Sequence, residues 1–166
     1  MGLAALRLLV IDDNEQMRTI VGSVLLAAGA RHIHYAPDGR SGLDVMAEQS
    51  IDVVYVDYEM PAMNGLDFIA AVRRLSTSDQ YMPIIMLTSH SDRPRLDAAR
   101  DHGVTEFLCK PVTARAILTR LSAVIMNPRP FVQSPDYFGP DRRRTRRRFH
   151  EGPLRRSSDF GDVIEL

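Results

Sequence analysis

The stretch VVYVDYEMPAMNG, residues 53–65, decides the fold of this chain. It opens with an apolar, valine-rich run of strand length, Val53–Val56, which ends at a single acid, Asp57. Apolar residues at helical spacing begin directly after Gly65. The stretch therefore predicts a buried strand, a polar residue at its carboxyl end, and then a helix.

The same strand-then-helix pattern recurs along the first three quarters of the chain. Asp38, Asp92 and Thr113 are predicted helix starts, and Gly29 is a predicted helix end. The predicted strands are Leu6–Ile11, Ile33–Ala36, Val53–Val56, Ile84–Leu87 and Phe107–Cys109. Five strands alternating with helices predict an α/β domain, a five-stranded parallel sheet covered by helices on both faces, over residues 1–127.

Composition sets the class of protein. Apolar residues make up 45% of the 166 residues, which is enough for a core. The N-terminus becomes acidic too early for a signal peptide, and no apolar run approaches a membrane span, so we expect a cytoplasmic protein without membrane insertion. The one cysteine, Cys109, lies in an apolar run and is expected in the core.

Polar residues follow four of the predicted strands at their carboxyl ends. Asp12 and Asp13 end the first strand and Asp57 the third, while Thr88 ends the fourth and Lys110 the fifth. In an open parallel sheet these ends meet at one edge, where functional residues gather. The sequence therefore predicts a site with three carboxylates, one hydroxyl and one ammonium.

This set of side chains suits a metal-assisted phosphorylation of an aspartate. Clustered carboxylates favour Mg²⁺, with Asp12, Asp13 and Asp57 as ligands and the backbone carbonyl of Glu59 completing the shell. Asp57 would attack the phosphoryl group, and Lys110, the single lysine of the chain, would neutralise its charge as a compact cation. We expect the Thr88 hydroxyl to donate to a phosphoryl oxygen afterwards.

LLVIDD, VDYEMPAMNG, MLTS and FLCKP together resemble the receiver domain of two-component response regulators, the CheY-like fold. The resemblance implies the flavodoxin-like (βα)5 topology with strand order 2-1-3-4-5. It also implies phosphorylation of Asp57 by a histidine kinase or phosphotransfer protein, and switching through Thr88 and an aromatic residue, here Phe107. Such a domain accepts a phosphoryl group on its own aspartate, so we expect no separate substrate turnover.

Residues 128–166 differ in composition from the rest. Residues 1–126 carry 12 basic and 15 acidic side chains, net −3, whereas residues 127–166 carry nine arginines and six acids, net +3. Five prolines and no long helical or strand period predict a tail that is disordered when alone, with Val163–Leu166 as a short segment that could dock. Three interpretations stay open: a solvated charge run, nonspecific attraction to nucleic acid or acidic membranes, and a nucleotide site.

The nucleotide interpretation rests on the chemistry of arginine. Guanidinium groups pair with phosphate in a bidentate manner, stack on flat bases and pair with the O6/N7 edge of guanine, while a carboxylate accepts from guanine's N1–H and N2–H. Cyclic di-GMP combines two guanines with two phosphates, and a receiver with an arginine-rich tail resembles the Cle-type CheY-like proteins, cyclic di-GMP effectors that act on the bacterial flagellar motor. The motor switch protein is then the expected partner. The expected ligand residues are Arg142, Arg143, Arg144, Arg146, Arg147, Arg148, Arg155, Arg156 and Asp159.

Overall fold

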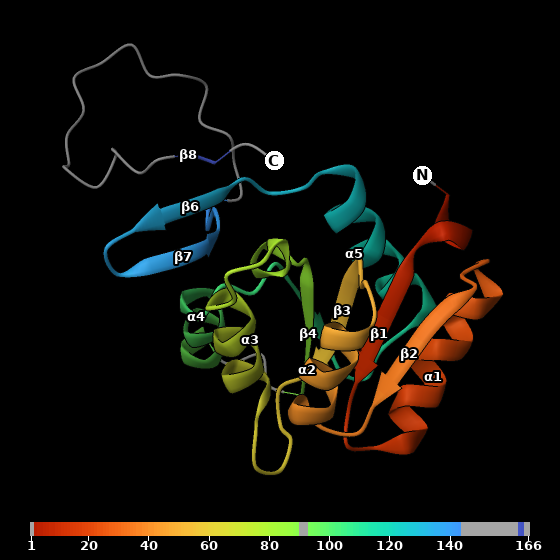
Figure 1. Cartoon of the computed structure of the whole chain (residues 1–166). Helices are drawn as coiled ribbons and strands as arrows, with labels where there is room; N and C mark the ends of the chain where they lie inside the picture. Colours follow the sequence, from red (N-terminus) through yellow and green to blue (C-terminus); the bar gives the residue numbers. More distant parts are fainter. Residues whose placement is uncertain (1, 90–92, 144–162, 165–166) are drawn as a thin grey trace.

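Five parallel strands in the order β2-β1-β3-β4-β5 form the main sheet of the computed structural model (Figure 1). The structure describes residues 2–89, 93–143 and 163–164. The strands are β1 (Arg7–Ile11), β2 (His32–Ala36), β3 (Val53–Asp57), β4 (Ile84–Thr88) and β5 (Glu106–Cys109). The predicted fold class and strand order are confirmed, and every predicted strand end lies within one residue of the observed one.

Local capping signals fix where the helices begin. The side chains of Asp38 and Thr113 accept hydrogen bonds from backbone N–H groups of the next turn, as expected, and Asn14 and Asn64 do the same for two further helices. Gly29, at φ 103°, follows the first helix. The helices are α1 (Glu15–Ala27), α2 (Gly39–Glu48), α3 (Gly65–Arg73), α4 (Arg93–Asp101) and α5 (Ala114–Met126), with 3₁₀ turns η1 (Leu3–Ala5) and η2 (Ser78–Tyr81). Asp92 lies outside the described residues.

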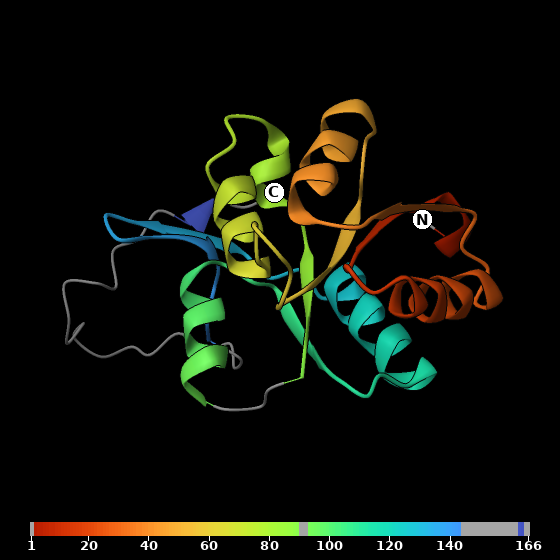
Figure 2. The ribbon, with the colours of Figure 1, turned by 90° about the horizontal axis from the view of Figure 1, so that it is seen from below.

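Alternation along the strands builds two cores. Leu9, Val54 and Ile84 belong to a cluster with buried residues of α2, α3 and α4. Their strand neighbours Leu8 and Tyr55 face the opposite side, where they pack with residues of α1 and α5. Helices therefore cover both sides of the sheet (Figure 2), and the polar ends of the strands remain at one edge.

A second, antiparallel sheet follows α5. It consists of β6 (Phe131–Ser134), β7 (Tyr137–Pro140) and β8 (Val163–Ile164), in the order β7-β6-β8. The composition of residues 128–166 predicts a tail that is disordered when alone, but in the whole chain residues 131–134 and 137–140 form two strands of four residues each. Val163–Ile164 pairs with β6, so two residues of the segment that could dock do so. Residues 144–162 lie outside the described part of the chain.

Aromatic contacts hold the β6–β7 hairpin against the domain that contains the main sheet. The ring of Phe131 is 5% exposed and lies edge-on to Tyr81 of η2, with ring centroids 5.2 Å apart. Phe138 makes a similar contact with Tyr81 at 5.5 Å. An isolated two-stranded hairpin is marginal in water, so these contacts explain why this one is ordered.

Arg73, the last residue of α3, is buried between the domain and the hairpin. Its side chain is 7% exposed and donates to the carbonyl of Gly103 from Nε (3.0 Å) and Nη2 (2.8 Å), and to that of Gln80 from Nη1 (2.8 Å). Phe131 stacks over it, with the guanidinium 5.0 Å from the ring centroid. Burial lowers the pKa of Arg73 to about 9, so the group is charged at neutral pH.

The hairpin also approaches the domain backbone closely at two glycines. A Cβ on Gly139 would lie 2.8 Å from the Cα of Gly103, and Gly103 itself has φ 91°. Side chains at either position would push the hairpin away. Residues 131–140 are therefore packed as part of the same body as the main sheet.

Cys109 is exposed, which corrects the expectation of a core residue. The strand β5 is the last of the sheet, and its alternation buries Leu108 while its neighbour Cys109 faces outward. Within the described ranges, no helix is long and apolar enough to cross a membrane.

Candidate functional site

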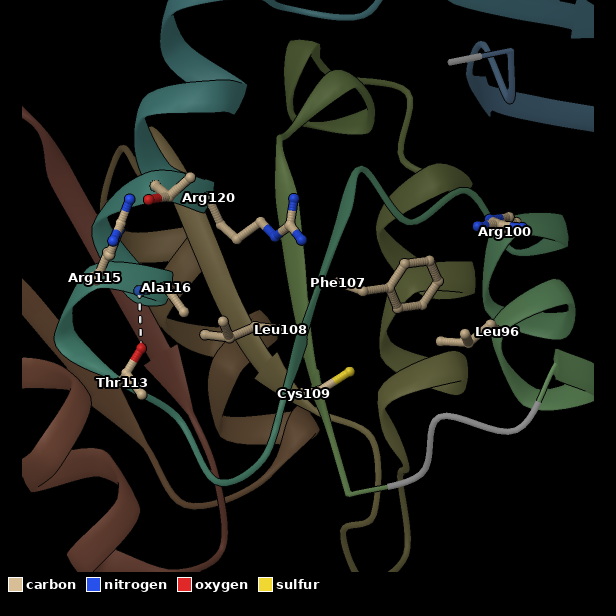
Figure 3. A pocket seen from close by; sticks show the side chains of 10 residues that line it. Leu96, Arg100, Phe107, Leu108, Cys109, Thr113, Arg115, Ala116 and Arg120 are labelled. Atoms are coloured by element: carbon tan, nitrogen blue, oxygen red, sulfur yellow. Dashed lines mark hydrogen bonds between the residues drawn. The ribbon is translucent and has the colours of Figure 1, made fainter.

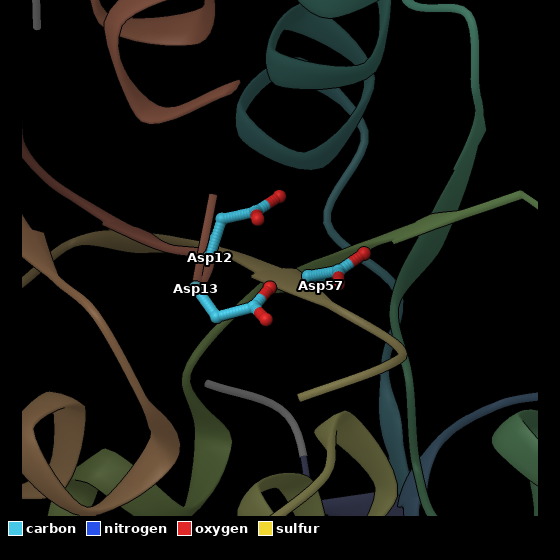
Figure 4. Close-up of side chains that lie close together, drawn as sticks. All are labelled: Asp12, Asp13 and Asp57. Atoms are coloured by element: carbon cyan, nitrogen blue, oxygen red, sulfur yellow. The ribbon is translucent and has the colours of Figure 1, made fainter. Parts of the chain in front are cut away.

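Three carboxylates meet at the carboxyl edge of the sheet (Figure 4). Asp12 and Asp13 follow β1, and Asp57 ends β3; one oxygen from each lies within 4.8 Å of the others. Asp12 and Asp57 are 1% and 4% exposed, whereas Asp13 is exposed to solvent. Two buried acids and one open acid make a site that a cation can enter from solvent.

Lys110 supplies the positive charge within this group. Its Nζ lies 2.9 Å from Oδ1 of Asp57 and 3.3 Å from Oδ2 of Asp12. Its backbone N–H donates to the carbonyl of Thr88 (2.9 Å), which fixes the end of β5 to the end of β4. The structure thus brings together the acids and the lysine that the sequence placed at separate strand ends.

Burial and like charges make the site costly to keep fully ionised. Burial raises the pKa of Asp57, and the charges of Asp12 and Asp13 raise it further, while Lys110 opposes the rise. Burial alone would lower the pKa of Lys110, but its contacts with Asp57 and Asp12 outweigh that effect, and the pKa is raised. Three acids beside one ammonium leave excess negative charge, which a divalent cation would neutralise.

Two arginines that the sequence analysis did not single out support the site. Arg18 of α1 donates from Nη1 to the backbone carbonyl of Asp12 (2.7 Å). Arg95 of α4 donates to Oε1 of Glu59 (2.7 Å), and its guanidinium lies 5.4 Å from the ring centroid of Tyr58. The partners of Arg95 are far away in sequence, so no local pattern could have found it.

The remaining predicted residues of the domain lie around this centre. Thr88 is buried at the end of β4. Phe107 is partly exposed on β5, with the guanidinium of Arg100 5.8 Å from its ring centroid. The switch roles of Thr88 and Phe107 stay predictions, as does the ligand role of the Glu59 carbonyl.

The predicted nucleotide ligands lie mostly beyond what the structure describes. Arg142 pairs with Asp101 of α4, and its guanidinium lies 4.2 Å from the ring centroid of Tyr137. Arg143 is exposed, and its backbone N–H donates to Asp141. The other predicted ligands fall outside the described residues: Arg144, Arg146, Arg147, Arg148, Arg155, Arg156 and Asp159.

The geometry suits the transfer of a phosphoryl group to Asp57. Its carboxylate lies 2.9 Å from Nζ of Lys110, whose ammonium can pair with a phosphoryl oxygen. Asp12, Asp13 and Asp57 could hold Mg²⁺, which when bound neutralises phosphoryl charge.

Comparison with known proteins identifies the family. Residues 8–122 match the response regulator receiver domain. The chain belongs to this family. Receiver domains accept phosphoryl groups from histidine kinases or phosphotransfer proteins and bind Mg²⁺ at an acidic pocket, here Asp12, Asp13 and Asp57.

Several relatives are chemotaxis proteins. The chain is 31% identical over 119 residues to the probable chemotaxis protein CheY of Rhizobium etli, covering 72% of this chain and 92% of that protein. The structure of Vibrio cholerae chemotaxis protein CheY4 matches with a TM-score of 0.68 and 32% identity, over 72% of this chain and 98% of that one. The sensory/regulatory protein RpfC of Xanthomonas campestris pv. campestris is 33% identical over 126 residues, 75% of this chain, but the match spans only 17% of its length.

Proposed function

We propose that this receiver is a single-domain, CheY-like response regulator that binds cyclic di-GMP through its arginine-rich segment. It interacts with a switch protein of the flagellar motor, in the cytoplasm, to tune motility. Asp57 is the phosphoacceptor, and a histidine kinase or phosphotransfer protein is the donor. Under this proposal, phosphorylation of Asp57 and binding of the nucleotide both regulate one interaction, that with the motor switch protein.

The packing of the β6–β7 hairpin on the domain is the observation that best supports binding of the nucleotide by the arginine-rich segment. The hairpin ends at Pro140, and the backbone N–H of Asp141 donates to the carbonyl of Pro130 (2.8 Å). The next residue, Arg142, pairs with Asp101 at the end of α4. The arginine-rich stretch therefore starts on the surface of the receiver domain, so a ligand held by its first arginines would touch α4.

Arg142 and Arg143 are exposed and have guanidinium groups of the kind that bind phosphate and stack on bases. Arg142 is exposed, and a guanidinium has five N–H donors, so pairing with Asp101 leaves donors for a phosphate. Its position over the Tyr137 ring matches the way arginine stacks on flat groups. A phosphate would also compete with Asp101 for the same cation, which would change how the segment is held on α4.

The proposed partner surface is the face formed by α4, β5 and α5. Phe107 lies there, partly exposed, between the two helices. The likeness to chemotaxis proteins of other bacteria supports a motor partner, because this chain's receiver domain matches 92% of one such protein and 98% of another. A structural change caused by phosphorylation of Asp57 would be transmitted to this face through β4 and β5. The ends of these strands are joined by the hydrogen bond from the backbone N–H of Lys110 to the carbonyl of Thr88.

Calorimetric titration of the full chain with cyclic di-GMP tests the nucleotide part. We expect saturable binding at micromolar nucleotide in physiological salt, and a large loss of affinity when Arg146, Arg147 and Arg148 are replaced with alanine. Binding to any oligonucleotide with equal affinity, falling steeply with salt, would show nonspecific polyanion attraction instead. No binding would leave a purely phosphorylation-controlled receiver in a phosphorelay.

A further inference from the structure

Arg95, the third residue of α4, contacts the two residues that directly follow Asp57 in the chain. Its Nη1 donates to Oε1 of Glu59 (2.7 Å), and its guanidinium lies 5.4 Å from the ring centroid of Tyr58. The first turn of α4 contains no acid, and a positive side chain there opposes the helix dipole. The contacts with the loop after β3 therefore explain an arginine at a position that the helix itself disfavours.

Glu59 is a fourth acid at the edge of the acidic site. Among the described residues, the acids whose oxygens lie within 4.8 Å of one another are Asp12, Asp13 and Asp57, and Glu59 is not in this group. The Cα of Glu59 is nevertheless no more than about 7 Å from that of Asp57, because the two are only two residues apart. The ion pair with Arg95 holds the Glu59 carboxylate on the α4 side and neutralises it there.

The exposure of this ion pair sets the size of its effect on the site. The side chains of Arg95 and Glu59 are 37% and 56% exposed, so water and salt screen both charges. A single screened charge near a divalent cation changes its binding by a factor of a few. The effect of the pair should also shrink as salt is added.

Arg95 lies on a different side of α4 from the residues that face β5. Leu96 and Arg100, four residues apart, share the side of the helix that lies toward Phe107 (Figure 3). Successive residues of a helix are rotated by about 100°, and the side chain of Arg95 reaches the loop that contains Glu59. A change at Arg95 therefore perturbs the acidic site and leaves the side chains of the proposed partner surface in place.

We propose that Arg95 is a positioning residue for the acidic site, which holds the Glu59 carboxylate away from a bound cation and from an incoming phosphoryl group. It acts through Glu59 and not by contact with the reacting atoms. Without Arg95, the freed carboxylate attracts Mg²⁺ more strongly and repels an anionic phosphodonor. These two consequences have opposite signs, which a general loss of structure at the site would not produce. The second consequence rests on the proposed phosphorylation of Asp57, whereas the first does not.

Two measurements on the full chain test this role. Mg²⁺ binding is followed by NMR without a phosphodonor, and phosphoryl uptake from acetyl phosphate is followed by intact mass at saturating Mg²⁺. In Arg95→Ala, we expect the affinity for Mg²⁺ to rise about threefold and uptake to slow about threefold, with both changes shrinking in about 1 M salt. Arg95→Lys keeps the charge and should lie within about twofold of the wild type in both measurements.

Arg93→Ala is the matched control, because it removes the same charge from the same turn of α4. The Arg93 side chain is 90% exposed and lies 3.8 Å from Asp97, so its loss should change either measurement by less than about 1.5-fold. Adding Glu59→Gln to Arg95→Ala removes both charges of the pair and should return both measurements to about the wild-type values. Thermal unfolding checks that each variant is folded.

Three results would overturn the inference. An Mg²⁺ affinity that is unchanged or weaker in Arg95→Ala would show that Glu59 is not held away from the cation. Equal effects of Arg93→Ala would show that only the net charge of α4 matters, and effects that Glu59→Gln does not reverse would show that Arg95 does not act through Glu59. If the wild type binds Mg²⁺ but takes up no phosphoryl group, the proposed acceptor role of Asp57 fails, while the Mg²⁺ titration still decides the role of Arg95.

Discussion

Replacing Phe131 with alanine tests whether the β6–β7 hairpin is part of the folded domain. The ring is 5% exposed and contacts Tyr81, Phe138 and the guanidinium of Arg73. Removing a buried phenylalanine costs about 3–5 kcal/mol, and the aromatic and cation–π contacts are included in that range. The hairpin can separate from the domain before the rest of the chain unfolds. We therefore expect Phe131→Ala to lower the free energy of unfolding by about 3 kcal/mol, the lower end of that range.

Urea unfolding followed by circular dichroism measures this loss. Gln133→Ala is the control, because Gln133 lies on the same strand with an exposed side chain, and it should change the free energy of unfolding by less than about 0.5 kcal/mol. A loss below about 1 kcal/mol for Phe131→Ala would mean that the hairpin contributes little to the fold. The docking of the arginine-rich segment on α4 would then have no support.

Three further perturbations address the buried charges. Arg73→Lys should cost about 2 kcal/mol, because lysine lacks the planar guanidinium whose three nitrogens donate to the carbonyls of Gly103 and Gln80. Arg74→Lys, at an exposed position, should be neutral in the same urea experiment. Asp57→Asn should stabilise the domain without Mg²⁺ at neutral pH. Because the pKa of Asp57 is raised in the folded state, the stability of the wild type should fall as the pH rises from 3.8, the ordinary pKa, through the raised pKa, and the stability of the variant should not. Unfolding curves that show no such difference between the two proteins would contradict the electrostatics. Lys110→Arg should slow phosphoryl uptake from acetyl phosphate at least about tenfold, because the guanidinium group is larger than the single Nζ that contacts the carboxylates of Asp12 and Asp57. Unchanged uptake would contradict the role assigned to Lys110.

The strands and the site acids could be predicted because their signals are local. Short apolar runs mark each strand, and a polar residue directly follows four of them, so the parallel sheet alone brings Asp12, Asp57 and Lys110 together. Capping residues such as Asp38 and Thr113 act within one helical turn, which is why they too are visible in the sequence.

The hairpin and Arg73 could not be predicted in the same way. The strands β6 and β7 have four residues each and lie among prolines, too short for a clear period of two, although aromatic residues flank a Pro-Asp turn. Arg73 ends a helix, where an arginine is normally solvated, and its partner carbonyl at Gly103 is 30 residues away. Only the tertiary structure shows that a charge is buried there.

Intact-mass measurement of phosphoryl incorporation tests the central claim most directly, namely that Asp57 is the acceptor in a Mg²⁺-dependent site. Wild-type protein incubated with acetyl phosphate and Mg²⁺ should gain the mass of one phosphoryl group, and chelation of the metal should prevent the gain. Asp57→Asn should gain nothing, while Asp52→Asn, a matched change of an acid away from the site, should behave as the wild type does. Incorporation that persists in Asp57→Asn, or that does not depend on Mg²⁺, would contradict the account.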